Sequence, residues 1–267
     1  MDHPAFPGFE PLAAGPTSLT KSSGRNGVSN ALQLVGDYTN PILKPEAAEI
    51  VKRFGEMSLS HFGYPTPRNQ CWPGGLPFEF TNNKMMMLQK PEETLILYRL
   101  DHQVRPVRMN QSHPARITPS WFGDSVGHYE GDTLVVDTVA IRIGPYAMVD
   151  WFGTPRTPAL HVVERYRLLS YEDAKEGMDR SARENGIPEF RVNPNDRGEH
   201  LQLLFTVEDA GVFTTPWSAT ITYGRQVPLP GRVSDPNAWE EDVCAENPHK
   251  YGTEKDAAVP TADRPDF

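Results

Sequence analysis

The residues best suited to chemistry in this sequence are ionisable side chains on segments whose apolar and polar positions alternate. The clearest case is the run His161–Leu169, in which one face of an extended chain carries Val162, Glu164, Tyr166 and Leu168. Because that face carries the apolar pair Val162 and Leu168, we predict that it points into the protein and that Glu164 is buried with it. A buried carboxylate must pair with a cation or have its pKa raised, because an isolated charge in low dielectric costs several kcal/mol.

Two roles are open for Glu164. It is a structural anchor if it hydrogen-bonds to a neighbouring arginine, for which Arg99, Arg105 and Arg108 are candidates. It is the acid or base of a cavity site if its pKa is raised beside the Tyr166 hydroxyl, since such a pair suits proton transfer.

The hairpin segment offers a second group for proton transfer. His128 and Glu130 lie two apart on one side of a predicted strand. They form either a solvated rim or a histidine base next to a carboxylate, because histidine titrates near neutral pH.

The candidate catalytic residues are Glu164, His128, Tyr166, His102 and Arg105. In this hypothesis Glu164 or His128 removes a proton and Tyr166 or His102 donates one. Arg105 stabilises the negative charge that develops.

Aromatic residues at strand positions are first of all core residues, and a ligand cavity lined by a few of them is the second interpretation. The candidate substrate-binding residues are Tyr98, Trp121, Tyr129, Phe205 and Trp217. No phosphate, dinucleotide or zinc spacing occurs, so we predict no cofactor and no metal.

The spacing of Gly123, Ser125 and Gly127 fits the GxSxG motif of serine hydrolases. That motif requires a strand followed by a helix in a parallel α/β sheet, whereas a hairpin follows here. The match therefore does not favour a serine nucleophile.

A hairpin and a series of short strands must position these residues. Gly131 and Asp132 predict a tight turn, and Thr133 begins a β-branched strand after it. The predicted strands are Thr94–Leu100, Val104–Met109, Ala115–Pro119, Val126–Tyr129, Thr133–Ile141, His161–Leu169, Leu201–Val207 and Trp217–Arg225. Met85, Met86 and Met87 are interpreted as adaptable core filling.

This series predicts a mainly β fold, a single antiparallel β-barrel of lipocalin or calycin type with one N-terminal docking helix, one inserted helix and long ordered loops. An extended N-terminal arm is expected over residues 1–39 and the barrel domain over 40–227. Its helices are expected at about 45–55 and about 171–185. A proline-rich C-terminal tail over 228–267 is expected to pack on the barrel.

Composition excludes several kinds of partner. The chain has 267 residues, with 26 Lys and Arg against 35 Asp and Glu, so its net charge of −9 repels nucleic acid. We expect no membrane span, because no run approaches the roughly 18 apolar residues that one needs. Without a signal sequence the location expected is cytoplasmic, or periplasmic or secreted if the chain is a processed form. A homo-oligomer is left open.

The two cysteines, Cys71 and Cys244, are either free buried thiols or a bridge. In a reducing cytosol free thiols are the expectation. Neither has a CxxC partner, which argues against a metal or redox role.

Several motifs together are similar to a large group of bacterial proteins of uncharacterised function, many of them exported. The motifs are Trp121-x-Gly-x-Ser-x-Gly-His-Tyr-Glu-Gly-Asp-Thr-Leu-Val-Val-Asp-Thr138, Leu160-His-Val-Val-Glu-Arg-Tyr166, Asn40-Pro-Ile-Leu-Lys-Pro45 and Cys244-Ala-Glu-Asn247. Members usually carry tryptophan where Tyr129 stands, and often a signal sequence. The resemblance implies that the hairpin, the strand around Glu164 and both cysteines are shared framework or site positions.

The sequence predicts a cofactor-independent acid/base enzyme, a lyase, dehydratase or isomerase, that acts on a small, largely apolar organic molecule in a β-barrel cavity. The alternative is a non-catalytic lipocalin-like carrier of a hydrophobic ligand. Fold alone does not separate the two.

Overall fold

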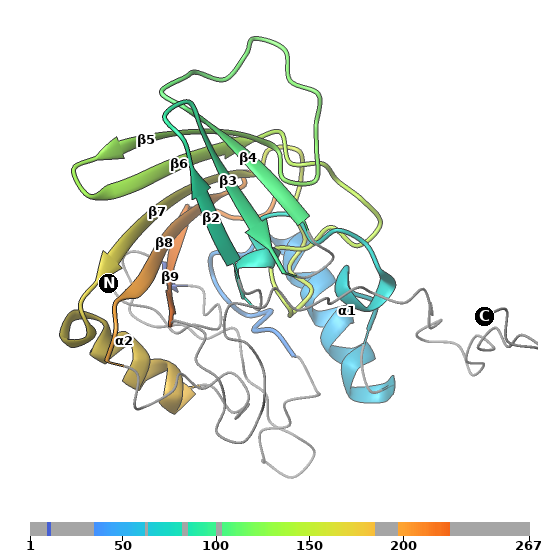
Figure 1. Ribbon diagram of the computed structural model, residues 1–267. Coiled ribbons are helices and arrows are strands. Elements are labelled where there is room, and N and C mark those ends of the chain that lie inside the picture. Colours follow the sequence, from blue (N-terminus) through green and yellow to red (C-terminus); the bar gives the residue numbers. More distant parts are fainter. Residues whose placement is uncertain are drawn as a thin grey trace, which may run out of the picture.

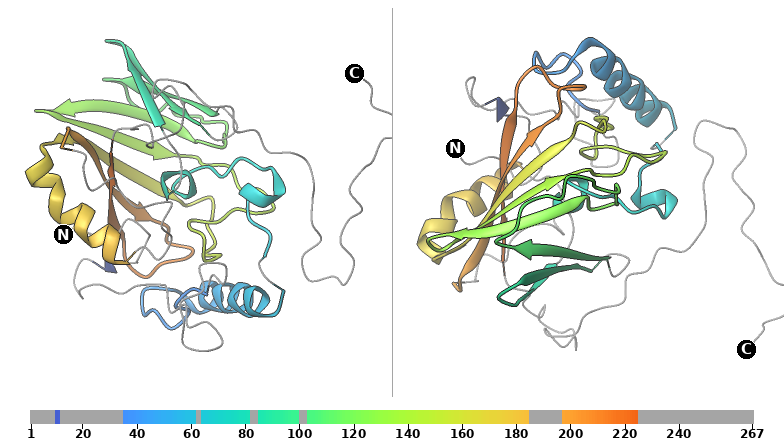
Figure 2. Two further views of the ribbon diagram at one scale, coloured as in Figure 1. Left: turned by 60° about the horizontal axis from the view of Figure 1, so that its bottom comes forward. Right: turned by 90° about the horizontal axis from the view of Figure 1, so that it is seen from above.

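One curled β-sheet dominates the part of the chain that the structure describes (Figure 1). The computed structural model describes residues 10–11, 35–61, 64–81, 85–99, 103–184 and 197–224. Within these ranges the sheet curls like half of a barrel, and the two α-helices lie on different sides of it (Figure 2). The predicted mainly β class and a barrel-like curvature are therefore confirmed.

The sheet has nine described strands in the spatial order β1-β9-β8-β7-β6-β5-β4-β3-β2. Their bounds are Glu10–Pro11 for β1, Met85–Gln89 for β2, Glu93–Tyr98 for β3, Gln103–Met109 for β4, Asp124–Glu130 for β5, Thr133–Val139 for β6, His161–Leu169 for β7, His200–Glu208 for β8 and Trp217–Tyr223 for β9. Neighbours pair antiparallel except β4 and β5, which are parallel over a short stretch. The prediction of a wholly antiparallel sheet is wrong at this one pair.

The parallel pair exists because the chain crosses over between β4 and β5. Residues 110–123 make this connection, which forms the long loop at the top of Figure 1. The predicted strand Ala115–Pro119 lies within it and is not a strand. Two prolines, Pro114 and Pro119, lack the N–H group that a central ladder requires, which accounts for the difference.

The turn between β5 and β6 forms as predicted. Glu130 pairs with Thr133 and leaves a two-residue connection. Gly131 has φ +63°, a conformation that glycine adopts without a Cβ clash. This turn fixes the register that brings β5 side chains next to those of β6.

Strand β7 begins and ends where the sequence predicts, and Val162, Glu164 and Tyr166 are buried on one face. The prediction fails at Leu168, which is 62% exposed, whereas Leu169 is buried. Leu169 packs against Ala174 of the following helix, so contact with that helix overrides strict alternation at the strand end.

The helices are α1, Pro45–His61, and α2, Tyr171–Glu184. Helix α1 continues beyond its predicted end at about residue 55, so Gly55 lies inside the helix and does not terminate it. Instead, a Cβ at Gly55 would lie 3.0 Å from Val35 Cγ1, so this glycine permits close packing. None of the described helices has the length and apolar character needed to cross a membrane.

Between α1 and β2 the chain forms two 3-10 turns, η1 at Arg68–Gln70 and η2 at Phe78–Thr81. Within the predicted N-terminal arm the described residues are 10–11 and 35–39, and the predicted tail 228–267 lies outside the described residues.

Candidate functional site

Arg105 is the centre of a buried polar network on the inner face of the sheet. A guanidinium has five N–H donors, and each of them has an acceptor here. Nε donates to Ser125 Oγ at 3.0 Å, Nη1 to Glu164 Oε2 at 2.8 Å and Tyr98 Oη at 3.4 Å, and Nη2 to Glu164 Oε1 and Thr138 Oγ1, both at 2.6 Å. The donors of Arg105 are therefore fully used within the protein.

Glu164 is held equally firmly. Both of its oxygens accept from Arg105, and Oε2 also accepts from the Tyr166 hydroxyl at 2.7 Å. The side chains of Arg105 and Glu164 are 1% and 0% exposed. Burial raises the pKa of Tyr166 well above its usual value, and the charge of Glu164 adds to this. The predicted pairing of Glu164 with an arginine is thus confirmed, and the partner is Arg105.

Strand order explains how the network assembles. Tyr98, Arg105, Ser125, Thr138 and Glu164 come from the consecutive neighbours β3, β4, β5, β6 and β7. Ser125 pairs directly with Thr138 across β5 and β6, and their hydroxyls lie 3.0 Å apart. Ser125 therefore shares its hydroxyl with this network and is not placed as a hydrolase nucleophile.

His128 lies on the opposite face of the sheet from Glu164. Gly127 pairs with Val136, and Val136 pairs with Glu164, so His128, one residue further along, points the other way. Its Nε2 lies 3.2 Å from Glu130 Oε1, and both side chains are about half exposed. A mechanism in which Glu164 and His128 serve one cavity is therefore wrong.

The five predicted substrate-binding residues separate into different surroundings. Phe205 and Trp217 pack edge to face in the core with ring centroids 5.9 Å apart. Tyr98 belongs to the Arg105 network and stacks on Phe122. Tyr129 is 49% exposed on the hairpin. They do not line one cavity together, and His102 lies outside the described residues.

Trp121, the fifth, belongs to a group that we call the aromatic cluster: Trp72, Trp121, Tyr146 and Arg142. The Trp72 ring is edge-on to Trp121 and Tyr146, with centroids 5.6 Å and 6.4 Å apart. The Arg142 guanidinium carbon lies 5.1 Å from the Trp121 ring centroid, within the range of a cation–π contact. A Cβ at Gly144 would lie 2.7 Å from the Trp121 ring, so only glycine permits this approach.

The loop that carries Trp72 is tied down at the preceding residue. Cys71 adopts a left-handed conformation with φ 53° and is disulfide-bonded. The other cysteine of the sequence, Cys244, lies outside the described residues. The expectation of free thiols is wrong for Cys71. Composition alone does not show whether a second sulfur lies within bonding distance of it.

The outer face of the sheet carries a second ionisable group, which we call the acid–histidine chain: Arg108, Asp124, His113, Asp137, His161 and Glu208. Arg108 donates two hydrogen bonds to Asp124, at 2.7 and 2.9 Å. His113 bridges two carboxylates, with Nδ1 2.6 Å from Asp124 and Nε2 2.8 Å from Asp137. Both ring nitrogens of His113 therefore lie against carboxylate oxygens.

The chain continues to β7 and β8. His161 Nε2 lies 2.9 Å from Asp137 Oδ2, and its Nδ1 lies 3.7 Å from Glu208. The hydrogen bond from His161 holds the pKa of Asp137 below its usual value, and the same bond raises the pKa of His161. This chain fastens the crossover segment, through His113, to the strands beneath it.

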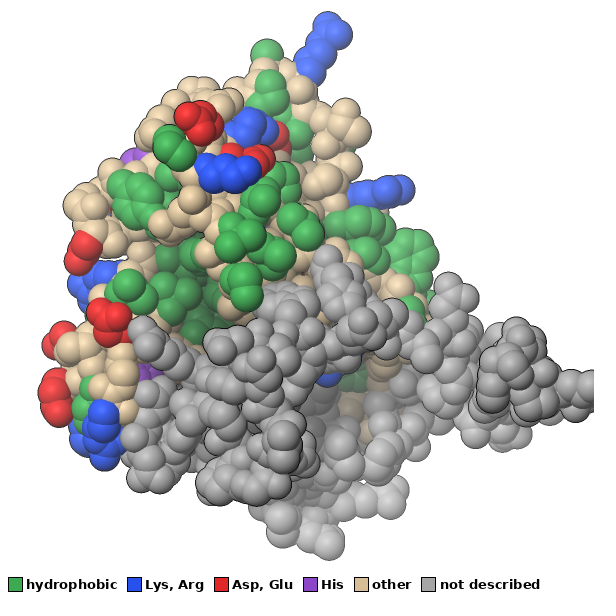
Figure 3. Space-filling model, viewed as in Figure 1, with side chains coloured by type: hydrophobic (Ala, Val, Ile, Leu, Met, Phe, Trp, Pro, Cys, Tyr) green, Lys and Arg blue, Asp and Glu red, His purple; other side chains and the backbone are tan. Residues whose placement is uncertain are grey.

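Hydrophobic side chains gather over β2, β3 and β4 in the space-filling view (Figure 3). Met86, Leu97 and Val104 form one row across these strands, and Met86 and Val104 are exposed. This apolar patch carries no ionisable or hydrogen-bonding side chain, so it lacks the polar groups that orient a small molecule.

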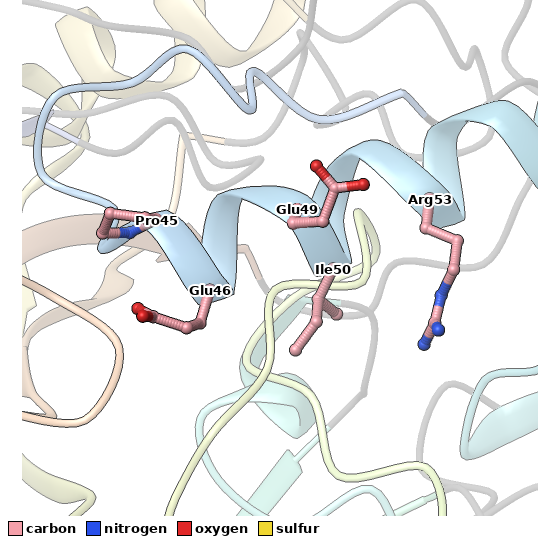
Figure 4. Close-up of a pocket in the computed structure, with 5 residues that line it drawn as sticks. All are labelled: Pro45, Glu46, Glu49, Ile50 and Arg53. Atoms are coloured by element: carbon pink, nitrogen blue, oxygen red, sulfur yellow. The ribbon is translucent and has the colours of Figure 1, made fainter.

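A cavity of about 460 Å³ runs along α1 (Figure 4) and is lined by Pro45, Glu46, Glu49, Ile50 and Arg53. Glu46, Ile50 and Arg53 project from one side of the helix. None of the predicted site residues lines this cavity, and its lining has no aromatic ring.

Within the described ranges, no set of three or more His, Cys, Asp or Glu side chains could hold a metal ion.

Two residues of the acid–histidine chain could have been found from the sequence. Asp124 and Asp137 were missed, although each stands at a strand position of the hairpin motif. Phasing both strands from the turn at Gly131 would have placed them on the solvent face with His128, opposite Ser125.

Comparisons of the chain with protein-family models, with curated proteins and with solved structures find no match. The resemblance to exported bacterial proteins therefore stays a prediction.

Proposed function

We propose that this protein binds a small, largely apolar organic molecule without transforming it, as a lipocalin-like carrier does, and that the molecule docks on the aromatic cluster. The observation that carries the proposal is the arrangement of Trp72, Trp121 and Tyr146. Their rings meet edge to face, while Trp72 remains 39% exposed. Tryptophan, tyrosine and arginine are the residues that contribute most affinity at binding surfaces.

The exposed part of Trp72 sets the scale of the affinity. A tryptophan side chain buries up to about 250 Å². Covering the 39% that is exposed would remove roughly 100 Å² of surface from water, which at about 25 cal/mol per Å² contributes about 2 kcal/mol. Contact with the other two rings adds to this value.

The cluster is also preorganised. The disulfide at Cys71 constrains the chain beside Trp72, and the close approach of Gly144 fixes the Trp121 ring. A rigid surface loses little side-chain entropy when a ligand binds, so more of the contact energy is expressed as affinity.

Binding is favoured over catalysis because of the state of Glu164. A general acid or base must come within hydrogen-bond distance of the proton that it transfers. Here Arg105 and Tyr166 occupy the carboxylate, and the pair is fully buried. The acid/base enzyme stays a prediction that would require a substrate to displace these contacts.

Affinity measurements on variants test the proposal. We expect the neutral aromatic probe 2-naphthamide to bind the wild type in an NMR titration. The variant Trp72→Ala should weaken binding about tenfold or more, because 1.4 kcal/mol corresponds to a factor of ten. Tyr129→Ala removes an aromatic ring of similar exposure from the hairpin and should leave binding unchanged.

Equal affinity of the wild type and Trp72→Ala would overturn the proposed site. Circular dichroism of each variant establishes that the fold is retained. If Glu164→Gln folds and binds the probe but a reaction of that probe disappears, catalysis replaces the carrier hypothesis.

A further inference from the structure

Arg156 is a buried guanidinium directly behind the aromatic cluster. It lies in the connection between β6 and β7 and is 5% exposed. Nη1 donates to the carbonyl of Leu76 at 2.8 Å, and Nη2 to the carbonyl of Arg142 at 3.4 Å. A Cβ at Gly75 would lie 3.0 and 3.1 Å from the two Nη atoms and would also contact the carbonyl oxygen of Trp121. The guanidinium is therefore next to the backbone of two cluster members.

The positive charge of Arg156 has no hydrogen-bonded carboxylate among the described residues. Its two acceptors are backbone carbonyls, and its Nε has no hydrogen-bond partner. Burial lowers its pKa to about 10, while the charge of Glu79 acts in the opposite direction. Buried charges are ordinarily paired because an unpaired one is costly. An anion bound beside the cluster would add to the partial compensation that the charge of Glu79 provides.

Arg142 is a second cation at the same place. Its side chain is exposed over the Trp121 ring and makes no ion pair with a described carboxylate. Arg105, Arg108 and Arg165, in contrast, are each paired with a carboxylate. On a chain whose net charge is −9, two such arginines create a local positive potential that attracts anions.

We propose that the ligand of the aromatic cluster is a planar aromatic acid, whose ring packs on Trp72 and Trp121 and whose carboxylate is held by Arg142 in the field of Arg156. This inference rests on the proposed function and adds the chemical class of the ligand. A guanidinium presents parallel N–H donors that match a carboxylate, and such charge-assisted bonds are about twice as strong as neutral ones. The charge of Arg156 strengthens the attraction between the site and the carboxylate, because a Coulomb interaction is screened less where water is excluded.

Paired probes with the same ring system and similar shape, one anionic and one neutral, test the inference. We expect 2-naphthoate to bind the wild type about 10- to 100-fold more tightly than the neutral 2-naphthamide, measured by isothermal titration calorimetry. Arg142→Gln should remove most of this difference, because an amide carries no charge to hold the carboxylate. Arg165→Gln, which alters an exposed arginine of β7 paired with Glu130, is the matched control and should preserve the difference.

The outcomes separate the two proposals. Equal affinity for 2-naphthoate and 2-naphthamide would overturn the inference about charge while the binding site at the cluster stands. A preference for 2-naphthoate that survives in Arg142→Gln would also overturn it. Binding of neither probe at millimolar concentration would overturn the proposed function and this inference together.

Discussion

Replacing Glu164 with glutamine tests whether its pair with Arg105 anchors the sheet. The substitution keeps the side-chain shape but removes the negative charge where both partners are at most 1% exposed. Arg105 then remains buried with an uncompensated charge. Removing one partner of a buried ion pair costs about 3–5 kcal/mol, a large fraction of the roughly 5–15 kcal/mol that stabilises a native protein.

The contacts explain this magnitude. The carboxylate accepts two bonds from Arg105, at 2.6 and 2.8 Å, and one from Tyr166 at 2.7 Å. A glutamine amide offers one oxygen, and its NH₂ group would face a donor. Hydrogen bonds to charged groups contribute about 1.5–3 kcal/mol each, so the loss of one or two is consistent with the expected cost.

Urea unfolding at neutral pH, followed by circular dichroism, measures the effect. Glu130→Gln is the control, because Glu130 forms a comparable short pair with Arg165 on the exposed face, and the urea midpoint should not change. The double variant Arg105→Met with Glu164→Leu should recover much of the lost stability, since apolar residues often replace a buried pair without net cost. A Glu164→Gln protein within about 0.5 kcal/mol of the wild type, the range of surface substitutions, would refute the anchor role.

Two further predictions concern the acid–histidine chain and the aromatic cluster. The hydrogen bond to Asp137 raises the folded-state pKa of His161, so its stabilisation is fully present below the unfolded pKa of about 6.5 and is lost as pH rises through the folded value. The urea midpoint of the wild type should exceed that of His161→Gln by more near pH 6 than near pH 8, and an equal difference would contradict this. Gly144→Ala places a Cβ 2.7 Å from the Trp121 ring and should cost about 1–3 kcal/mol by overpacking. Unchanged stability and near-ultraviolet circular dichroism would disprove that contact.

Strongly alternating segments allowed much of the fold to be predicted. Strand β7 has the predicted bounds because its β-branched and aromatic residues follow a period of two. Strand β2 was missed, since Met85, Met86 and Met87 are apolar on both faces and show no alternation. Only the pairing with β3 identifies this segment as a strand and places it at the end of the sheet.

The sequence predicted that Glu164 points into the protein, but it did not predict which arginine pairs with it. Alternation along one strand places the carboxylate inside, whereas the choice among Arg99, Arg105 and Arg108 depends on register between strands. His128 was grouped with Glu164 for the same reason. The alternation of residues within one strand does not show which of its faces aligns with the buried face of another strand. Trp72 was not among the predicted site residues, and it is partly exposed in the aromatic cluster.

The ligand site is tested most directly by an NMR titration in which the indole N–H signals of the five tryptophans are followed as 2-naphthoate is added. Trp72 and Trp121 should shift with saturable dependence on ligand concentration. Trp217, which is 0% exposed in the core, should not move. Saturable shifts confined to other tryptophans, or no shifts at all, would contradict binding at the aromatic cluster.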